Sequence, residues 1–423
     1  MSRSQVIPET LSGKRIVNQI RDVLDNVSIP AEQPNKKMIP LSLGDPTTFG
    51  NLMTTDIFIK ALQKAAASPA AHGYQHTTGS KAAKEAVAKR SAAATGRKVE
   101  AADVFLASGC SGALDISLQA LASPGDNILL PQPGFALYET LALAHGIEVR
   151  HYPLLPHKKW EIDVDALEQL VDDKTRAILV NNPSNPCGSV YSKEHLCDVL
   201  AAAERLNLAV IADEIYGNLV FSGETFYSMA ELAKNVPVLE VGGLAKEFLV
   251  PGLRVGWIIM HDVELEDGQT ALQNVRRSAL RLTQLTLGAN TLVQACMPDI
   301  LTPKAGSPEE RQLAQFNADT IAQLESNAKF VTKRINSMRG LRATTPQGAM
   351  YTMVEIDQSQ IAMDDVKFTQ QLVDEELVFV LPGSCFGMAN FVRIVYCAPE
   401  EVLAEACDRI EAFLKRLSTA VGN

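Results

Sequence analysis

Six short apolar segments within residues 104–260 constrain the fold of this chain more than any other feature. Each is four or five residues long, and the stretches between them are long enough to hold helices. Short buried strands that alternate with helices are typical of a mostly parallel sheet covered on both faces, which is an α/β fold. The expected strands are residues 104–107, 127–130, 177–180, 208–212, 238–241 and 256–260.

A second, smaller domain is predicted after this region. Ser307 is followed by Pro308 and, three residues on, by Glu310, which is a capping box with proline at the first helical position. We expect a long helix that extends to Met338 and is closed by Gly340. The predicted domains are 1–51 (N-terminal arm and part of the small domain), 52–315 (large domain) and 316–423 (small α+β domain, with strands near 350–354 and 391–395).

Polar residues follow the predicted strands and differ from one strand to the next. In parallel α/β sheets, ligands bind beyond the carboxyl ends of the strands, so these residues predict one composite site. After the first strand, Gly109, Cys110 and Ser111 open a helical stretch whose backbone amides could hold a phosphate. A plain glycine turn with Ser108 as the helix N-cap is the alternative.

Three further strand ends carry candidate ligand groups. Asn185 lies in a loop with two Asn-Pro pairs, which suits a fixed side-chain amide, although a structural turn is the alternative. Asp213 directly follows five apolar residues, so we weigh a buried carboxylate against an ordinary helix N-cap, which is the more common use. Phe135 could stack on a flat ligand or could belong to the core.

Three basic residues complete the set of candidates. Lys246 follows a strand and two glycines, an unusual place for lysine, and a desolvated lysine can act as a nucleophile or base. Arg254 is suited to a phosphate, with a generic surface role as the alternative. Arg393 lies inside an apolar run, where it calls either for a ligand carboxylate or for an intramolecular salt bridge.

Composition excludes several classes of function. The 49 acidic residues exceed the 39 basic ones, and the net charge of -10 argues against binding to nucleic acid. No stretch is apolar enough to cross a bilayer or to act as a signal peptide. The 7 cysteines are scattered, which favours a reduced, cytoplasmic protein, with a mitochondrial location left open.

In order and spacing, these residues resemble the class I, fold-type I aminotransferases that use pyridoxal 5'-phosphate, along nearly the whole chain. The nearest subgroup is that of the tyrosine aminotransferases. The stretches that carry the resemblance are residues 44–52, 133–138, 160–163, 182–189, 242–246 and 251–252. It implies a large domain with a mostly parallel seven-stranded sheet flanked by helices, plus a smaller α+β domain.

The resemblance also implies roles toward the cofactor. Lys246 would carry it as a Schiff base, Asp213 would pair with its ring nitrogen, and Phe135 would stack on the ring. Asn185 and Tyr216 would hydrogen-bond its phenolic oxygen. Its phosphate would be held by Gly109, Cys110, Ser111, Arg254 and, from a neighbouring subunit, Tyr74, which implies a homodimer with shared sites.

Toward the substrate, the resemblance implies that Arg393 binds the α-carboxylate, helped by Asn185 and the backbone near Gly44. The reaction would move an amino group from an aromatic L-amino acid (tyrosine; phenylalanine, tryptophan, methionine and alanine are further candidates) to a 2-oxo acid, in ping-pong fashion. A second arginine, for a side-chain carboxylate, stays open among Arg276, Arg277 and Arg281.

Two positions depart from the family pattern: Gly243 stands where many members have a serine, and Leu253 where a tryptophan is common. A lyase that uses the same cofactor for β-elimination or C–S cleavage is the main alternative activity. A cofactor-binding regulator is disfavoured because the N-terminal arm is too short for a DNA-binding domain. A dinucleotide oxidoreductase is disfavoured because residues 108–113 lack the GxGxxG pattern.

Overall fold

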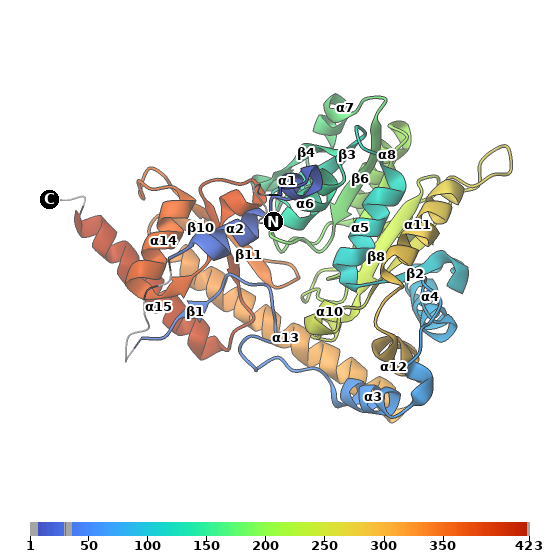
Figure 1. Ribbon diagram of the computed structural model, residues 1–423. Helices are drawn as coiled ribbons and strands as arrows, with labels where there is room; N and C mark the ends of the chain where they lie inside the picture. The colour runs from blue at the N-terminus through green and yellow to red at the C-terminus, as the bar shows by residue number, and fades with distance from the viewer. Residues whose placement is uncertain (1–6, 29, 31–35, 421–423) are drawn as a thin grey trace, which may run out of the picture.

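The computed structural model describes residues 7–28, 30 and 36–420, and a large twisted sheet lies in the lobe on the right of Figure 1. The sheet has eight strands in the order β2-β9-β8-β7-β6-β3-β4-β5. Strands β3, β4, β6, β7 and β8 pair in parallel, whereas β9 runs antiparallel to both of its neighbours. The strands are β2 (Val104–Ala107), β3 (Asn127–Gln132), β4 (Glu148–Leu155), β5 (Glu161–Ile162), β6 (Thr175–Asn181), β7 (Ala209–Asp213), β8 (Val238–Gly243) and β9 (Gly256–His261).

The α/β class with a mostly parallel sheet is confirmed, and all six predicted strands are present. The predicted number of seven strands was too low, because the two-residue strand β5 adds an eighth at the edge. Strand β4 was also absent from the predicted strands. It carries Glu148, Arg150 and His151 and is only partly buried, so it shows no continuous apolar run.

Helices cover both faces of the sheet because successive residues of each strand point to opposite sides. Phe105, Ile211 and Val241 pack on one face with helices α5, α6 and α11. Leu106 and Trp257 pack on the other face with α3, α4 and α12, and further along this face the sheet packs on α8 and α9. The helices are α3 (Asp56–Ala66), α4 (Lys81–Thr95), α5 (Gly109–Leu121), α6 (Ala136–Ala144), α7 (Leu167–Leu170), α8 (Lys193–Arg205), α9 (Met229–Leu232), α10 (Leu244–Glu247), α11 (Gln273–Thr286) and α12 (Thr291–Leu301).

The long helix α13 (Pro308–Asn336) connects the two parts of the chain, as Figure 1 shows. Ser307 caps it by accepting from the backbone N–H of Glu310, as predicted. The helix ends two residues before the expected Met338, with Ser337 as its C-cap. Near its start Leu313 packs with α3 and α12, and further along Leu324 packs against the C-terminal part.

The C-terminal part is built on a four-stranded antiparallel sheet of order β10-β11-β14-β13. Two further strands, β1 and β12, pair in parallel, so the chain before residue 51 joins this part. The domain boundaries at residues 52 and 316 stay a prediction. The elements are α1 (Leu11–Arg15), α2 (Gln19–Asn26), β1 (Ile39–Pro40), β10 (Leu341–Ala343), β11 (Tyr351–Ile356), α14 (Asp365–Glu376), β12 (Val378–Phe379), β13 (Leu381–Pro382), β14 (Phe391–Val395) and α15 (Glu400–Ala420).

Among the described residues, no helix combines the length and the apolar character that a membrane crossing requires.

Candidate active site

One cavity of about 330 Å3 brings together most of the predicted site residues. It lies where the carboxyl ends of β7 and β8 and the start of α5 meet residues of the C-terminal sheet, as the topology of parallel sheets predicts. Ten of the predicted residues line it: Gly44, Cys110, Ser111, Phe135, Asn185, Asp213, Tyr216, Lys246, Arg254 and Arg393.

Asp213 is the last residue of β7, and only 3% of its surface is exposed. Its Oδ2 accepts a hydrogen bond from the Tyr138 hydroxyl at 2.6 Å, and its Oδ1 accepts from Ile215 N at 3.2 Å and from Cys110 Sγ at 3.6 Å. No helix begins here, so the N-cap interpretation was wrong. Burial raises the pKa of Asp213, although the three donors partly oppose the shift. A cationic ligand group would restore the charged form.

Lys246 lies on α10, directly after the end of β8. Its Nζ donates to the backbone oxygen of Gly44 at 2.5 Å and lies 5.9 Å from the centre of the Tyr216 ring. The Tyr216 hydroxyl in turn shares a hydrogen bond of 2.7 Å with the hydroxyl of Tyr351. No described carboxylate pairs with Lys246, so its amine faces the cavity without a counter-ion.

The start of α5 and Arg254 form a cradle for an anion. Gly109 has a φ of +71°, which favours glycine, and a β-carbon there would lie 2.5 Å from Nη2 of Arg254, so a larger residue would displace the guanidinium from the cradle. Ser108 occupies the N-cap position of α5, as the alternative expected, but its side chain makes no capping hydrogen bond, which leaves the first amides of the helix available. Arg254 is exposed and is held by the backbone oxygens of Pro251 and Ser108.

Arg393 is 3% exposed and points into the cavity from β14. It donates to Oδ1 of Asn185 at 2.9 Å and to the backbone oxygen of Ser42 at 2.5 Å, and the rings of Tyr351 and Phe386 flank it. Its Nε is buried without a partner, and no described carboxylate pairs with it, which contradicts the salt-bridge alternative. Because an uncompensated buried cation is costly, a ligand carboxylate is the expected partner.

The loop that carries Asn185 is fixed by a residue that the sequence did not single out. Asn181 accepts from the backbone N–H of Asn185 at 2.7 Å and donates to the backbone oxygen of Asp213 at 3.0 Å. The last residue of β6 therefore sets the positions of two predicted site residues at once.

Other contributions to the cavity were also missed. Tyr138 lies three residues after Phe135, a helical spacing that could have signalled it, whereas Tyr351 has no local signal. From the N-terminal segment, Asn18, Ile20 and Arg21 line the cavity because α2 packs on Phe386 and its neighbours.

Some predicted residues lie elsewhere. Tyr74 is 89% exposed and does not line the cavity. Of the open candidates for a second arginine, Arg276 is committed to Asp103 at 2.9 Å, and Arg277 donates to Asn274.

The cavity therefore offers an amine without a described carboxylate partner, a buried carboxylate, an anion cradle and a buried guanidinium with an unpartnered N–H. This set of groups fits a flat aldehyde cofactor that carries a basic ring nitrogen and a phosphate, together with a substrate carboxylate.

Comparison with known proteins agrees with this description of the site. Residues 36–410 match the family described as aminotransferase class I and II. The tyrosine aminotransferase of Mus musculus is 44% identical over 98% of this chain and 88% of that relative. The crystal structure of tyrosine aminotransferase from Leishmania infantum superimposes with a TM-score of 0.89 at 33% identity, over 98% of this chain and 99% of the other. An alanine aminotransferase from Pyrococcus furiosus gives a TM-score of 0.86 at 29% identity, over 97% and 100%.

Proposed function

The chain belongs to the class I and II aminotransferases, and we propose that it moves the amino group of an aromatic L-amino acid to a 2-oxo acid with the help of pyridoxal 5'-phosphate. The observation that carries the proposal is Arg393, a buried guanidinium that faces the same cavity as Lys246 and Asp213 and has no carboxylate partner among the described residues. It supplies the recognition that every α-amino and 2-oxo acid requires.

Specific residues of the cavity would hold the cofactor. Lys246 would anchor it covalently, Asp213 would pair with its ring nitrogen, and Phe135 would cover the ring. Its phosphate would take the amides of Gly109, Cys110 and Ser111 together with Arg254, and Asn185 and Tyr216 would bond its phenolic oxygen. When bound, the cofactor supplies an electron sink for the charge that develops on the substrate α-carbon.

The chain's own residues would handle the proton and the orientation. Whenever its amine is not bonded to the cofactor, Lys246 would be the base that moves a proton within the cavity. The Tyr138 hydroxyl and the buried carboxylate of Asp213 stay fixed during the reaction, so no reorganisation is needed. Arg393, held by Asn185 and Ser42, fixes the substrate through its carboxylate, so that the α-carbon lies near the amine.

The preference for aromatic donors rests on the cavity lining and on the relatives. Ile20, Leu43 and Leu137 line the cavity and give it an apolar region suited to a ring. An apolar pocket separates related side chains by only ~1–3 kcal/mol, so phenylalanine, tryptophan and methionine should also react.

Two proposals concern the assembly and its surroundings. The exposed ring of Tyr74 is free to reach a second copy of the chain, as a homodimer with shared sites would require. All seven cysteines are unpaired, which supports a reducing compartment such as the cytoplasm.

An absorbance spectrum of the purified protein tests the proposal. Loaded with cofactor, the protein should show a near-visible band that falls when tyrosine is added and returns with a 2-oxo acid. Lys246→Ala removes the covalent anchor and should abolish the cycle. If no band forms even after incubation with pyridoxal phosphate, the proposal fails.

A further inference from the structure

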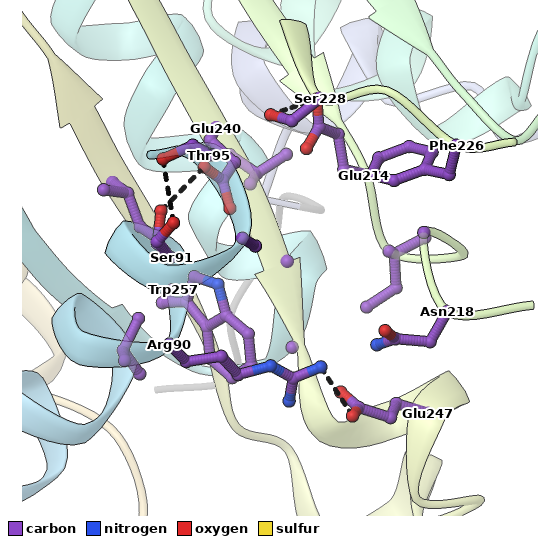
Figure 2. A pocket seen from close by; sticks show the side chains of 18 residues that line it. Arg90, Ser91, Thr95, Glu214, Asn218, Phe226, Ser228, Glu240, Glu247 and Trp257 are labelled. Atoms are coloured by element: carbon purple, nitrogen blue, oxygen red, sulfur yellow. Dashed lines mark hydrogen bonds and ion pairs between the residues drawn. The ribbon is translucent and has the colours of Figure 1, made fainter. Parts of the chain in front are cut away.

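A second cavity, of about 170 Å3, is lined by Gly242, Gly243 and Glu247, the neighbours of Lys246 in the chain. Figure 2 shows its side chains. Its walls come from α4, from β8 and β9, and from the chain that follows β7, so it touches the elements that build the active site without containing any predicted site residue. Charged side chains converge on it: Arg90 from α4, Glu214, Glu240 from β8 and Glu247 from α10. Such a concentration of charge next to a sheet needs a reason, because burying charge is costly.

Helix α10, which carries Lys246, has little internal support. It is four residues long, too short to be stable alone, and it begins directly after Gly242 and Gly243. Its N-cap residue, Gly243, offers no side chain for a capping bond. The orientation of Lys246 therefore depends on the contacts that α10 makes with neighbouring elements.

Apolar contacts hold the two ends of this segment. Leu244 is 1% exposed, and the ring of Phe248 packs on Phe58 at 5.6 Å. Leu244, Glu247 and Phe248 are three or four residues apart, so they share one face of this helical turn, and Lys246 lies on the other face. Glu247 also lines the charged cavity.

An ion pair adds a polar contact to the apolar contacts on this face. Nη2 of Arg90 lies 2.6 Å from Oε1 of Glu247, whose side chain is only 7% exposed (Figure 2). Arg90 belongs to a 15-residue helix whose Ala83, Ala86 and Val87 are packed in the core, so it is a rigid anchor. The nearby Glu240 is bound elsewhere, by the Ser91 hydroxyl and the His261 ring. Arg90 is thus the cation that the structure gives to Glu247.

We propose that Arg90 is a positioning residue for Lys246: through its ion pair with Glu247 it fixes α10 and so holds Nζ of Lys246 toward Gly44 and Tyr216. The inference rests on the proposed function of Lys246 as the covalent anchor. Without Arg90, a buried carboxylate would be left unpaired one residue after Lys246, and it would turn α10 toward water or toward the lysine amine.

The test compares Arg90→Met, Glu247→Gln and the charge reversal Arg90→Glu/Glu247→Arg. Arg176→Met is the matched control, because Arg176 forms a 2.6 Å ion pair with Asp126 far from α10. Two readouts besides activity are the rate at which the cofactor-free protein takes up pyridoxal phosphate and the circular dichroism of the near-visible band, which reports how rigidly the cofactor is held.

Arg90→Met should slow cofactor uptake and lower kcat by about tenfold while the KM for tyrosine changes less than about twofold, because Arg393 is untouched. The dichroism of the band should weaken by about half or more, and the reversal should restore each value to within about threefold of wild type. The control should change none of them. If Arg90→Met does not fold, Glu247→Gln, which keeps the shape of the side chain, carries the same expectations.

Unchanged uptake and dichroism in the single variants would overturn the proposal. A loss of cofactor uptake and dichroism that only parallels a fall in melting temperature, and that the charge reversal does not restore, would also overturn it. Such a result would mean that the ion pair has a purely structural role. If instead the wild-type protein forms no near-visible band, the proposed function fails; a normal band in the wild type with unaffected variants removes only the role of Arg90.

Discussion

The Tyr138 hydroxyl donates a 2.6 Å hydrogen bond to Oδ2 of Asp213, and both groups are buried. A donor to the ionised carboxylate favours its charged form, in opposition to the burial that raises the pKa of Asp213. The phenol keeps its proton in this role, because burial and the nearby Asp213 raise the pKa of Tyr138 well above its usual range. Tyr138 thus acts as a permanent donor to the residue that should meet the cofactor nitrogen.

Replacing Tyr138 by phenylalanine should therefore weaken cofactor binding. The pKa of Asp213 would rise further, less negative charge would face the ring nitrogen, and loss of a hydrogen bond to a charged group costs ~1.5–3 kcal/mol, or about tenfold or more in Kd. Titration of the cofactor-free protein, followed by near-visible absorbance, measures the effect. Tyr152→Phe loses a 2.7 Å bond to the backbone oxygen of Leu179 and should leave the cofactor Kd unchanged. Equal Kd values for both variants would contradict the assigned role.

Variants of the two arginines Arg393 and Arg254 should differ in their kinetic effects, because Arg393 would bind the substrate and Arg254 the cofactor. Arg393→Gln removes charge-assisted bonds to the substrate carboxylate, each worth ~1.5–3 kcal/mol, so kcat/KM for tyrosine should fall by about a hundredfold or more, mainly through KM. Arg254→Gln should instead weaken cofactor binding and, at saturating cofactor, leave the KM for tyrosine within about twofold. Steady-state kinetics at several cofactor concentrations distinguish the two, and exchanged phenotypes would refute the assignment.

The preference for one 2-oxo acid over another as the amino-group acceptor should depend on Arg21. Arg21 lines the cavity from α2 and forms no ion pair with any described residue, so we expect its guanidinium to meet a second carboxylate on the substrate. Arg21→Gln should raise the KM for 2-oxoglutarate by about three- to tenfold, as expected for a partly exposed charge-assisted contact, and leave the KM for pyruvate unchanged. An equal rise for both acceptors would mean that Arg21 acts on the shape of the cavity rather than on the distal carboxylate.

The sequence predicted the parts of the site that depend on strand ends and failed where distant segments meet. Asp213 is the last residue of β7, and Lys246 follows the end of β8 by three residues, so the α/β pattern places both at one edge of the sheet. Tyr351 reaches the site only because the C-terminal sheet docks there, and Arg21 only because α2 packs on Phe386. These positions follow from packing between segments that are far apart in the sequence, and no local sequence pattern encodes such packing.

Burial of Glu214 gives the stability of the protein a defined pH dependence. Burial and the nearby Glu240 raise its pKa well above the usual range, so the folded chain holds the proton more tightly than the unfolded chain. The free energy of unfolding that Glu214 contributes must therefore fall as pH rises from the ordinary glutamate pKa through the raised one. Glu214→Gln should be more stable than wild type near pH 8 and lose this advantage toward pH 5, as urea unfolding would measure.

Glu325 serves as a control, because its pKa is shifted in the opposite direction to that of Glu214. Hydrogen bonds from Lys329 and Ser222 lower its pKa to about 2, so its contribution is present at neutral pH and is lost as pH falls. Glu325→Gln should therefore be less stable than wild type at neutral pH. The same pH profile for both variants would mean that the environment of Glu214 does not favour its protonated form.

Shared active sites can be tested by mixing two impaired variants. Lys246→Ala lacks the anchor, whereas Tyr74→Phe lacks a hydroxyl that should reach the phosphate in the neighbouring subunit. In a mixed dimer, one site would combine both defects and the other would be intact, so unfolding and refolding the two together should recover about a quarter of wild-type activity. Tyr74 acting within its own subunit would leave every site of the mixed dimer defective and recover nothing, and sedimentation as a monomer would exclude the shared site altogether.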